Sequence, residues 1–193
     1  MRLFIAILLP EPVREALSAL RLGLPGARWV EPEAMHLTLR FMGEVNAGEA
    51  EDIDAALAAI HVPAFDLAIS GIGNFQSRRR VRSLWVGLGR SEPLARLQGK
   101  VESAVVRAGF EPERRKFKPH VTLARLKKTP VGHVGAYMET HDTFAVAPFA
   151  VTAFTLMRSY LNRDGPHYET LAEYPLEGAQ QPNRATVRST EPT

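Results

Sequence analysis

The chain opens with an apolar run that predicts a buried strand over residues 3–9. A Pro-Glu-Pro turn ends this run, and a different spacing follows. From about residue 13 to residue 22, apolar side chains recur at helical intervals at Val13, Leu17 and Leu20. This spacing predicts an amphipathic helix with these side chains on one face.

Short strand and helix patterns continue along the chain. Alternating or continuous apolar character predicts further strands at residues 28–30, 36–41, 65–72, 82–88, 120–126, 149–158 and 167–174. Helical spacing predicts helices at residues 48–60 and 92–107. We expect a hairpin loop at 73–80 and a loop without helical character around His133 and His141. Residues 178–193 are polar and lack periodicity, so we expect a disordered tail.

One arrangement of elements occurs twice. A strand, a helix, a loop and a strand that begins with histidine span residues 3–41 and again residues 82–126. The last strand begins HLTLRF in the first copy and HVTLAR in the second. The repeat predicts an α+β fold with two pseudo-symmetric lobes, each an antiparallel sheet with outer helices, flanking a central cleft. We expect residues 1–177 to form this single bilobal domain.

The strongest functional signal is the pair of His-x-Thr motifs in these strands. Alternate side chains of a strand point to opposite faces, so His36 shares a face with Thr38, and His120 with Thr122. Each strand therefore presents an imidazole and a hydroxyl to one surface, with aliphatic side chains behind them. If the two halves pack with approximate two-fold symmetry, the two pairs face each other across the cleft.

Composition and charge narrow the classes of protein. Apolar residues make up 45% of the chain and charged residues 23%, as in ordinary globular proteins. The absence of cysteine excludes disulfides, thiolate metal sites and a cysteine nucleophile. No apolar run reaches the length of a membrane span, so we expect a cytoplasmic protein without membrane association. A net charge of +3 is too small for the dense positive field of a duplex-binding protein.

The motifs and their surroundings resemble a known family. The opening MRLFIAILLPEPVREAL, the segments MHLTLRFMGEV and FKPHVTLAR, and the C-terminal SYLNRDGPHYETLAEYPL are similar to the two-histidine phosphoesterases. Within that superfamily they resemble the RNA 2′,3′-cyclic phosphodiesterases once called 2′-5′ RNA ligases. The resemblance implies RNA ends or cyclic nucleotides as substrates and a 2′-phosphomonoester as product. By analogy, His36 protonates the departing 3′-oxygen and His120 is the base toward water, although the pseudo-symmetry makes these roles exchangeable on sequence alone.

The chemistry of this reaction suits the residues present. Two histidines on opposite sides of phosphorus supply an acid and a base near neutral pH. The hydroxyls of Thr38 and Thr122 can donate hydrogen bonds to the equatorial phosphate oxygens. Neither a metal nor another cofactor is needed in this scheme.

Two arginines are further phosphate-binding candidates. Arg125 stands where the family tends to have an arginine, but ideal strand alternation places it on the face opposite His120. The same alternation places Arg40 on the His36 face. A stacking partner for the base must be aromatic, and Trp29, Phe117, Tyr160 and Tyr168 are the candidates.

Other functions stay open on the sequence. The same histidines could serve a 2′-5′ RNA ligase or a 2′-5′ phosphodiesterase, and a module that only binds RNA ends is a third alternative. The chain has no GxxxxGK[ST] motif, which excludes a P-loop enzyme and argues against ATP-dependent ligation. Nothing in the sequence indicates an obligate protein partner, so we expect a monomer.

Overall fold

The computed structural model describes residues 1–77, 80–162 and 165–179. Its strands are β1 (Arg2–Leu8), β2 (Ala27–Trp29), β3 (His36–Glu44), β4 (Phe65–Ser77), β5 (Arg80–Leu88), β6 (His120–Leu126), β7 (Ala145–Val151), β8 (Ala153–Asn162) and β9 (Gly165–Pro175). Its helices are α1 (Glu11–Ser18), α2 (Ala47–Ala58), α3 (Glu92–Arg107) and α4 (Val131–Thr140), with a short 3-10 turn, η1 (Pro32–Ala34). The predicted tail lies almost entirely outside the described residues and, like the domain boundary, stays a prediction.

The strands form one antiparallel sheet in the order β7-β4-β5-β6-β3-β1-β8-β9, with β2 paired to β6. The two strands that begin with histidine, β3 and β6, lie at its centre and meet at the single pair Leu37–Val121. On either side of this junction four strands follow, β3-β1-β8-β9 in one half and β6-β5-β4-β7 in the other. The predicted α+β fold with two similar antiparallel halves is confirmed.

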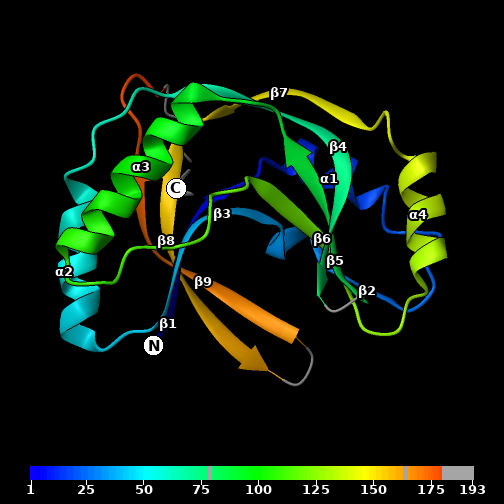
Figure 1. The fold of residues 1–193 in the computed structure, drawn as a ribbon. Helices are drawn as coiled ribbons and strands as arrows, with labels where there is room; N and C mark the ends of the chain where they lie inside the picture. The colour runs from blue at the N-terminus through cyan, green and yellow to red at the C-terminus, as the bar shows by residue number, and fades with distance from the viewer. Residues whose placement is uncertain (78–79, 163–164, 180–193) are drawn as a thin grey trace, which may run out of the picture.

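Two of the helices, α1 and α3, pack against the half of the sheet other than the one that they follow in the chain. α1 follows β1 of one half but packs against β7 of the other, and α3 follows β5 but packs against β3. α2 lies beside α3 and contacts β9, whereas α4 contacts β5. Figure 1 shows α2 and α3 together on one side of the molecule and α4 on the other. α3 also contacts β4 of its own half. Both repeats nevertheless place their helix against the opposite half of the sheet.

The sequence of α3 explains both its boundaries and its packing. The hydroxyl of Ser91 accepts a hydrogen bond from the backbone N–H of Leu94 and caps the helix. One stripe of the helix is buried against the sheet and comprises Leu94, Leu97, Val101, Ala104 and Val105. The residues predicted for this helix and for strand β6 are the residues observed.

Several predicted elements differ from the observed ones, and three of these differences have a clear physical cause. β4 continues to Ser77 through much of the expected loop, because it pairs with β5 as far as Arg80. The single strand predicted at 149–158 is two strands, β7 and β8, with a break at Thr152. α4 was predicted as loop because its two glycines and β-branched residues disfavour a helix. Burial of Val134 and Tyr137 stabilises it instead, and the Tyr137 hydroxyl donates a hydrogen bond to the Leu20 carbonyl.

Candidate active site

The register between β3 and β6 brings the two motifs together. These strands are antiparallel and Leu37 pairs with Val121, so His36 lies across from Thr122, and Thr38 across from His120. All four side chains point to the same face of the sheet. The two histidines occupy diagonal positions, for which the typical separation is about 7–8 Å and somewhat less between the Cβ atoms. This spacing leaves room for a phosphate between the imidazoles.

The two imidazoles are held in the same way. Nδ1 of His36 donates a hydrogen bond to the carbonyl oxygen of Ala34 at 2.8 Å. Nδ1 of His120 donates to the carbonyl oxygen of Lys118 at 2.7 Å. In each half the partner lies two residues before the histidine. A carbonyl oxygen can only accept, so the proton is on Nδ1 and Nε2 of each neutral ring is the free, basic nitrogen.

Aromatic side chains from neighbouring strands surround each histidine. The ring of His36 lies 4.8 Å from Phe4 of β1 and 5.0 Å from Tyr168 of β9, as measured between ring centroids. The ring of His120 lies 4.8 Å from Phe75 of β4 in an edge-to-face arrangement. The Trp85 indole is 6.0 Å from the same ring. These contacts restrict both imidazoles to one orientation.

Burial is the main influence on the protonation of the site. It lowers the pKa of His36 below its usual value of 6.5, and the neighbouring charges of His120 and Arg125 lower it further, against the hydrogen bond to Ala34. Burial also lowers the pKa of His120, and the Lys118 ammonium adds to this effect. That ammonium lies 4.4 Å from the centroid of the Trp85 ring. Both histidines are therefore neutral near pH 7 when the site holds no anion.

Each motif strand carries a β-bulge directly after its threonine. Leu39, which follows Thr38, is skipped in the pairing of β3 with β1. Leu123, which follows Thr122, is skipped in the pairing of β6 with β5. An extra residue of this kind reverses the alternation of side chains beyond it. The same irregularity at equivalent positions supports the internal repeat and changes the faces expected for the arginines that follow.

Arg125 and Arg40 exchange the faces that regular alternation predicts. Arg125 lines a cavity of about 200 Å³ together with His36 and Tyr168. On the other strand Phe41, not Arg40, lines that cavity with His36. The expectation that Arg40 shares the His36 face is therefore wrong, and the bulge at Leu39 is the reason.

The guanidinium of Arg40 is occupied by protein groups. The Arg40 side chain is only 9% exposed. Its Nε lies 3.0 Å from a carboxylate oxygen of Glu102, and one terminal nitrogen lies 3.3 Å from a carboxylate oxygen of Glu113. The other terminal nitrogen donates to the carbonyl of Glu111. Hydrogen bonds from Arg115 are the main cause that lowers the pKa of Glu113 to about 2, so this carboxylate stays charged. Arg40 also lines a second, larger cavity of the site, but these partners neutralise its charge there.

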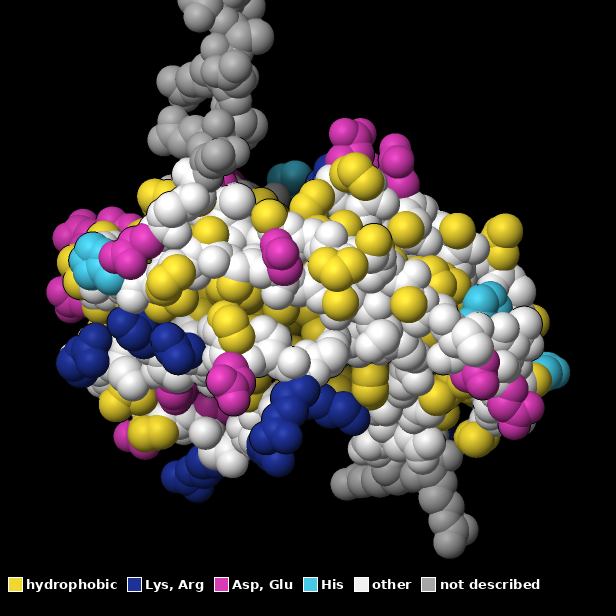
Figure 2. All heavy atoms as spheres, turned by 90° about the horizontal axis from the view of Figure 1, so that it is seen from above, with side chains coloured by type: hydrophobic (Ala, Val, Ile, Leu, Met, Phe, Trp, Pro, Cys, Tyr) yellow, Lys and Arg dark blue, Asp and Glu magenta, His cyan; other side chains and the backbone are white. Residues whose placement is uncertain are grey.

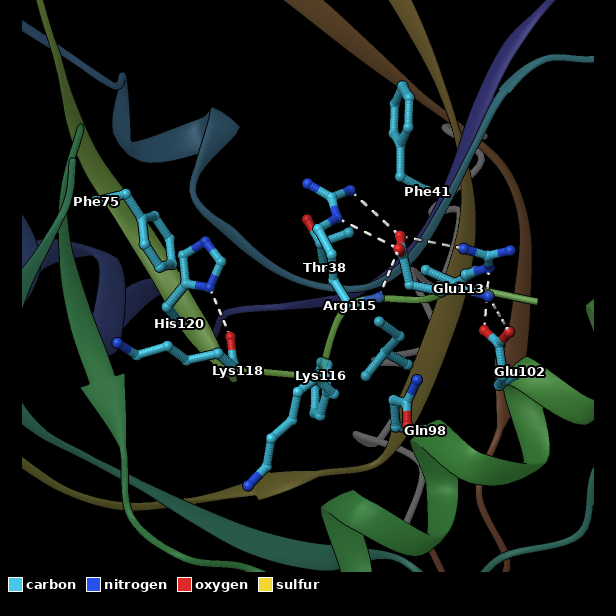
Figure 3. A pocket seen from close by; sticks show the side chains of 13 residues that line it. Thr38, Phe41, Phe75, Gln98, Glu102, Glu113, Arg115, Lys116, Lys118 and His120 are labelled. Carbon is cyan, nitrogen blue, oxygen red and sulfur yellow. Dashed lines mark hydrogen bonds and ion pairs between the residues drawn. The ribbon is translucent and has the colours of Figure 1, made fainter. Parts of the chain in front are cut away.

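This larger cavity, of about 590 Å³, borders the motif strands β3 and β6. Thr38 and His120 line its inner part, and Phe75 and Phe117 contribute apolar walls. Figure 3 shows His120 and Phe75 at one end of this cavity and the Glu102–Glu113 cluster at the other. Lys116 and Lys118, from the segment before β6, lie along the same cavity. The cavity thus combines an imidazole, a hydroxyl, aromatic surfaces and positive charge.

The four aromatic residues predicted as candidates for base stacking lie in different parts of the structure. Tyr168 contacts His36, and Phe117 lines the larger cavity. Trp29 packs on the core beside Tyr137, and Tyr160 donates a hydrogen bond to Glu169. Sequence reasoning missed Phe4, Phe75 and Trp85, because their proximity to the histidines depends on strand pairing.

The described ranges contain no group of three or more His, Asp or Glu side chains arranged to hold a metal ion. Within the same ranges, no helix is long and apolar enough to cross a membrane.

An α+β fold built on two central His-x-Thr strands defines a two-histidine phosphoesterase. The chain belongs to the family of LigT-like phosphoesterases, whose model matches residues 7–85 and 87–168. A curated relative from Aeropyrum pernix, named RNA 2′,3′-cyclic phosphodiesterase, is 39% identical over 78% of this chain and 86% of its own. A relative of the same name from Thermotoga maritima is 34% identical over 92% of this chain and 97% of its own.

Solved structures agree with this assignment. The crystal structure of E. coli LigT complexed with 3′-AMP has a TM-score of 0.73 and 30% sequence identity, covering 91% of this chain and 98% of that one. A protein from Thermus thermophilus has a TM-score of 0.77 at 30% identity, covering 93% of this chain and 100% of that one.

Proposed function

We propose that this protein hydrolyses 2′,3′-cyclic phosphate ends of RNA, or cyclic nucleotides, to 2′-phosphomonoesters by metal-independent acid–base catalysis. One observation carries the proposal: His36 and His120 lie diagonally across the β3–β6 junction, each with Nδ1 fixed by a carbonyl and Nε2 left for the substrate. The names of the relatives and the 3′-AMP bound by E. coli LigT support a nucleotide phosphate as the ligand.

The reaction requires one proton transfer on each side of phosphorus. His120 takes a proton from water on Nε2 while the water oxygen forms a bond to phosphorus. The bond from phosphorus to the 3′-oxygen breaks, and His36 delivers a proton from its Nε2 to that oxygen. The 2′-oxygen keeps the phosphate. General acid–base catalysis of this kind contributes about 10²–10⁴-fold to the rate.

The remaining site residues stabilise the negative charge of the phosphate. The hydroxyls of Thr38 and Thr122 donate hydrogen bonds to the equatorial oxygens, which gain negative charge in the transition state. Arg125, which the bulge places in the cavity with His36, adds a positive charge to the same region. We assign Arg40 no role in phosphate binding because its carboxylate partners neutralise it.

Substrate binding must change the protonation of His36. Burial disfavours the imidazolium in the free protein, but an adjacent phosphate anion favours it. An anion between the rings favours the protonated form of either histidine, and each histidine has a cationic neighbour, Arg125 or Lys118, that opposes it. The choice of His36 as the acid and His120 as the base therefore follows the family resemblance.

The test is incubation of the purified protein with an RNA oligonucleotide that ends in a 2′,3′-cyclic phosphate, in the presence of EDTA. We expect a 2′-phosphate end from the wild type and none from His36→Ala or His120→Ala. His133→Ala, on α4, is the matched control and should retain the wild-type rate. A strict metal requirement, or a 3′-phosphate product, would refute the mechanism.

The alternatives predict other results in the same assay. A 2′-5′ phosphodiesterase cleaves a 2′-5′ linked dinucleotide but leaves the cyclic end intact. A ligase joins this end to a 5′-hydroxyl RNA. A module that only binds RNA ends retains the oligonucleotide without converting it.

A further inference from the structure

α3 carries a row of basic side chains on its outer surface, away from the histidines. Arg96, Lys100 and Arg107 are exposed and lie on one stripe of the helix with Ser103. Together with Gly99 they line a groove of about 400 Å³ beside the end of α2. Figure 2 shows a row of dark blue side chains on the side of the molecule that α2 and α3 occupy. We refer to this feature as the α3 groove.

The positive charge of the α3 groove is not compensated locally. Its lining contains no acidic residue. None of Arg96, Lys100 and Arg107 forms an ion pair within residues 1–77, 80–162 and 165–179. Lys100 donates a hydrogen bond to the carbonyl of His61 at 2.8 Å, which holds its ammonium at the groove. Arg96 and Lys100 lie four residues apart on the helix, and like charges at this spacing repel each other.

Gly99 is a second feature that the fold does not explain. A glycine inside a helix costs about 1 kcal/mol relative to alanine. A Cβ atom built at this position meets no other atom within 4 Å, so internal packing does not require a glycine. The missing side chain keeps the groove open there, which allows a ligand backbone to approach the helix closely.

The α3 groove lies on the same helix as the larger cavity of the active site. Gln98 and Glu102, on the other flank of α3, line that cavity together with His120. The two hollows are therefore separated by the width of one helix, which is about 10 Å. Arg40 pairs with Glu102 at 3.0 Å and with Glu113 at 3.3 Å. These two carboxylates therefore repel the phosphates of an RNA strand less than unpaired carboxylates would.

We propose that the α3 groove binds the phosphodiester backbone of an RNA strand several nucleotides upstream of the cyclic end. The proposal rests on the proposed function for the identity of the strand. Arginine and lysine side chains along a groove neutralise phosphates without reading sequence, as in other proteins that bind single strands. A mononucleotide held between the histidines is too short to reach this groove. Contacts here distinguish RNA ends from free cyclic nucleotides.

The test compares a triple variant, Arg96→Gln with Lys100→Gln and Arg107→Gln, with a control that also loses three positive charges. The control carries Arg14→Gln on α1 and Lys127→Gln with Lys128→Gln after β6. Fluorescence anisotropy measures binding of an RNA of about 12 nucleotides with a cyclic phosphate end. Steady-state kinetics compare this RNA with 2′,3′-cyclic AMP.

Three phosphate contacts should contribute about 2 to the slope of log affinity against log salt concentration. Between 50 and 200 mM salt, the wild type and the control should therefore lose roughly twentyfold more affinity than the triple variant. The triple variant should also have a higher KM for the RNA, with kcat/KM for the cyclic mononucleotide unchanged.

Equal salt slopes for the triple variant and the control would overturn the proposal. Equal slopes together with charge-dependent binding of phosphatidylserine vesicles would assign the groove to a membrane surface instead. If the wild type converts neither substrate but the difference in slope persists, the RNA groove stands and the proposed reaction fails.

Discussion

Gly73 of β4 lies directly opposite Trp85 of β5, and the indole covers the position where a side chain would be. A Cβ atom at residue 73 would lie 2.1, 2.3 and 2.6 Å from three ring atoms of Trp85. Ordinary contacts begin near 3.4 Å, so Gly73→Ala must displace the indole or the strand by more than 1 Å. The same indole contacts His120, and the Lys118 ammonium lies over it. The substitution therefore acts on the active site through Trp85.

Two effects of Gly73→Ala can be estimated. Overpacking of this kind typically costs about 1–3 kcal/mol of unfolding free energy. In a chain of this size, each kcal/mol lowers Tm by about 2–4 °C. Displacement of a catalytic group by about 1 Å can cost about 100-fold in rate. We expect kcat for the cyclic phosphate substrate to fall by about 10–100-fold, with a smaller change in KM.

The assay separates loss of fold from loss of alignment. Tm is measured by thermal unfolding, and kcat is measured at a temperature where the variant is fully folded. Gly135→Ala on α4 is the matched control, because a Cβ atom there meets nothing within 4 Å. Alanine is the better helix former, so this control should keep its activity and gain up to about 1 kcal/mol.

A second substitution makes the reasoning refutable. Trp85→Leu in the Gly73→Ala background removes the clash together with the indole, so stability should recover more than activity. If Gly73→Ala lowers Tm but leaves kcat unchanged, the indole does not position His120. If it changes neither, the close packing of Trp85 on Gly73 is refuted.

Three further predictions concern pH and stability. Because burial lowers the pKa of both site histidines, the pH profile of kcat/KM should be bell-shaped with its maximum below pH 6.5. The value of kcat/KM falls at higher pH because the acid loses its proton, and at lower pH because the base gains one. Arg40→Met should destabilise the fold by about 2–3 kcal/mol in urea unfolding, since it leaves Glu102 without its guanidinium and Glu113 with only Arg115; a fully buried pair would cost more. Tyr174→Phe should cost about 1–2 kcal/mol because it removes the 2.6 Å hydrogen bond to Asp54 that ties β9 to α2.

Each of these has a result that contradicts it. A pH maximum well above 6.5 would mean that burial does not control the histidines. Arg115→Met is the control for Arg40→Met: its side chain is 86% exposed, so the cost should stay below about 1 kcal/mol. Equal costs for the two would show that the burial of Arg40 is irrelevant. No loss in Tyr174→Phe would show that water replaces the bond to Asp54.

The sequence predicted elements well where apolar periodicity was long and boundaries were marked. The helix at 92–107 and the strand at 120–126 were correct to the residue. The repeat around the two histidines also predicted the two-fold arrangement of the sheet. Prediction failed where tertiary contacts outweigh local preference. α4 forms from a glycine-containing segment because Val134 and Tyr137 are buried.

The two arginines show why a site cannot be read from strand alternation alone. Regular strand alternation placed Arg40 on the face of His36 and Arg125 on the opposite face, and the structure reverses both. The cause is a bulge at Leu39 and its counterpart at Leu123, which arise from the pairing of each strand with its neighbour. Neither bulge has a signature in its own strand.

The amino-acid sequence by itself indicated the candidate catalytic residues, because the histidine and threonine spacing is local and a strand presents alternate residues to one face. It also determined the α+β class, through the repeat. Only the tertiary structure decided how the site is assembled. The diagonal placement of His36 and His120, the aromatic rings around them and the partners of Arg40 depend on residues far apart in the chain. Such contacts are set by strand register and packing, which no local pattern encodes.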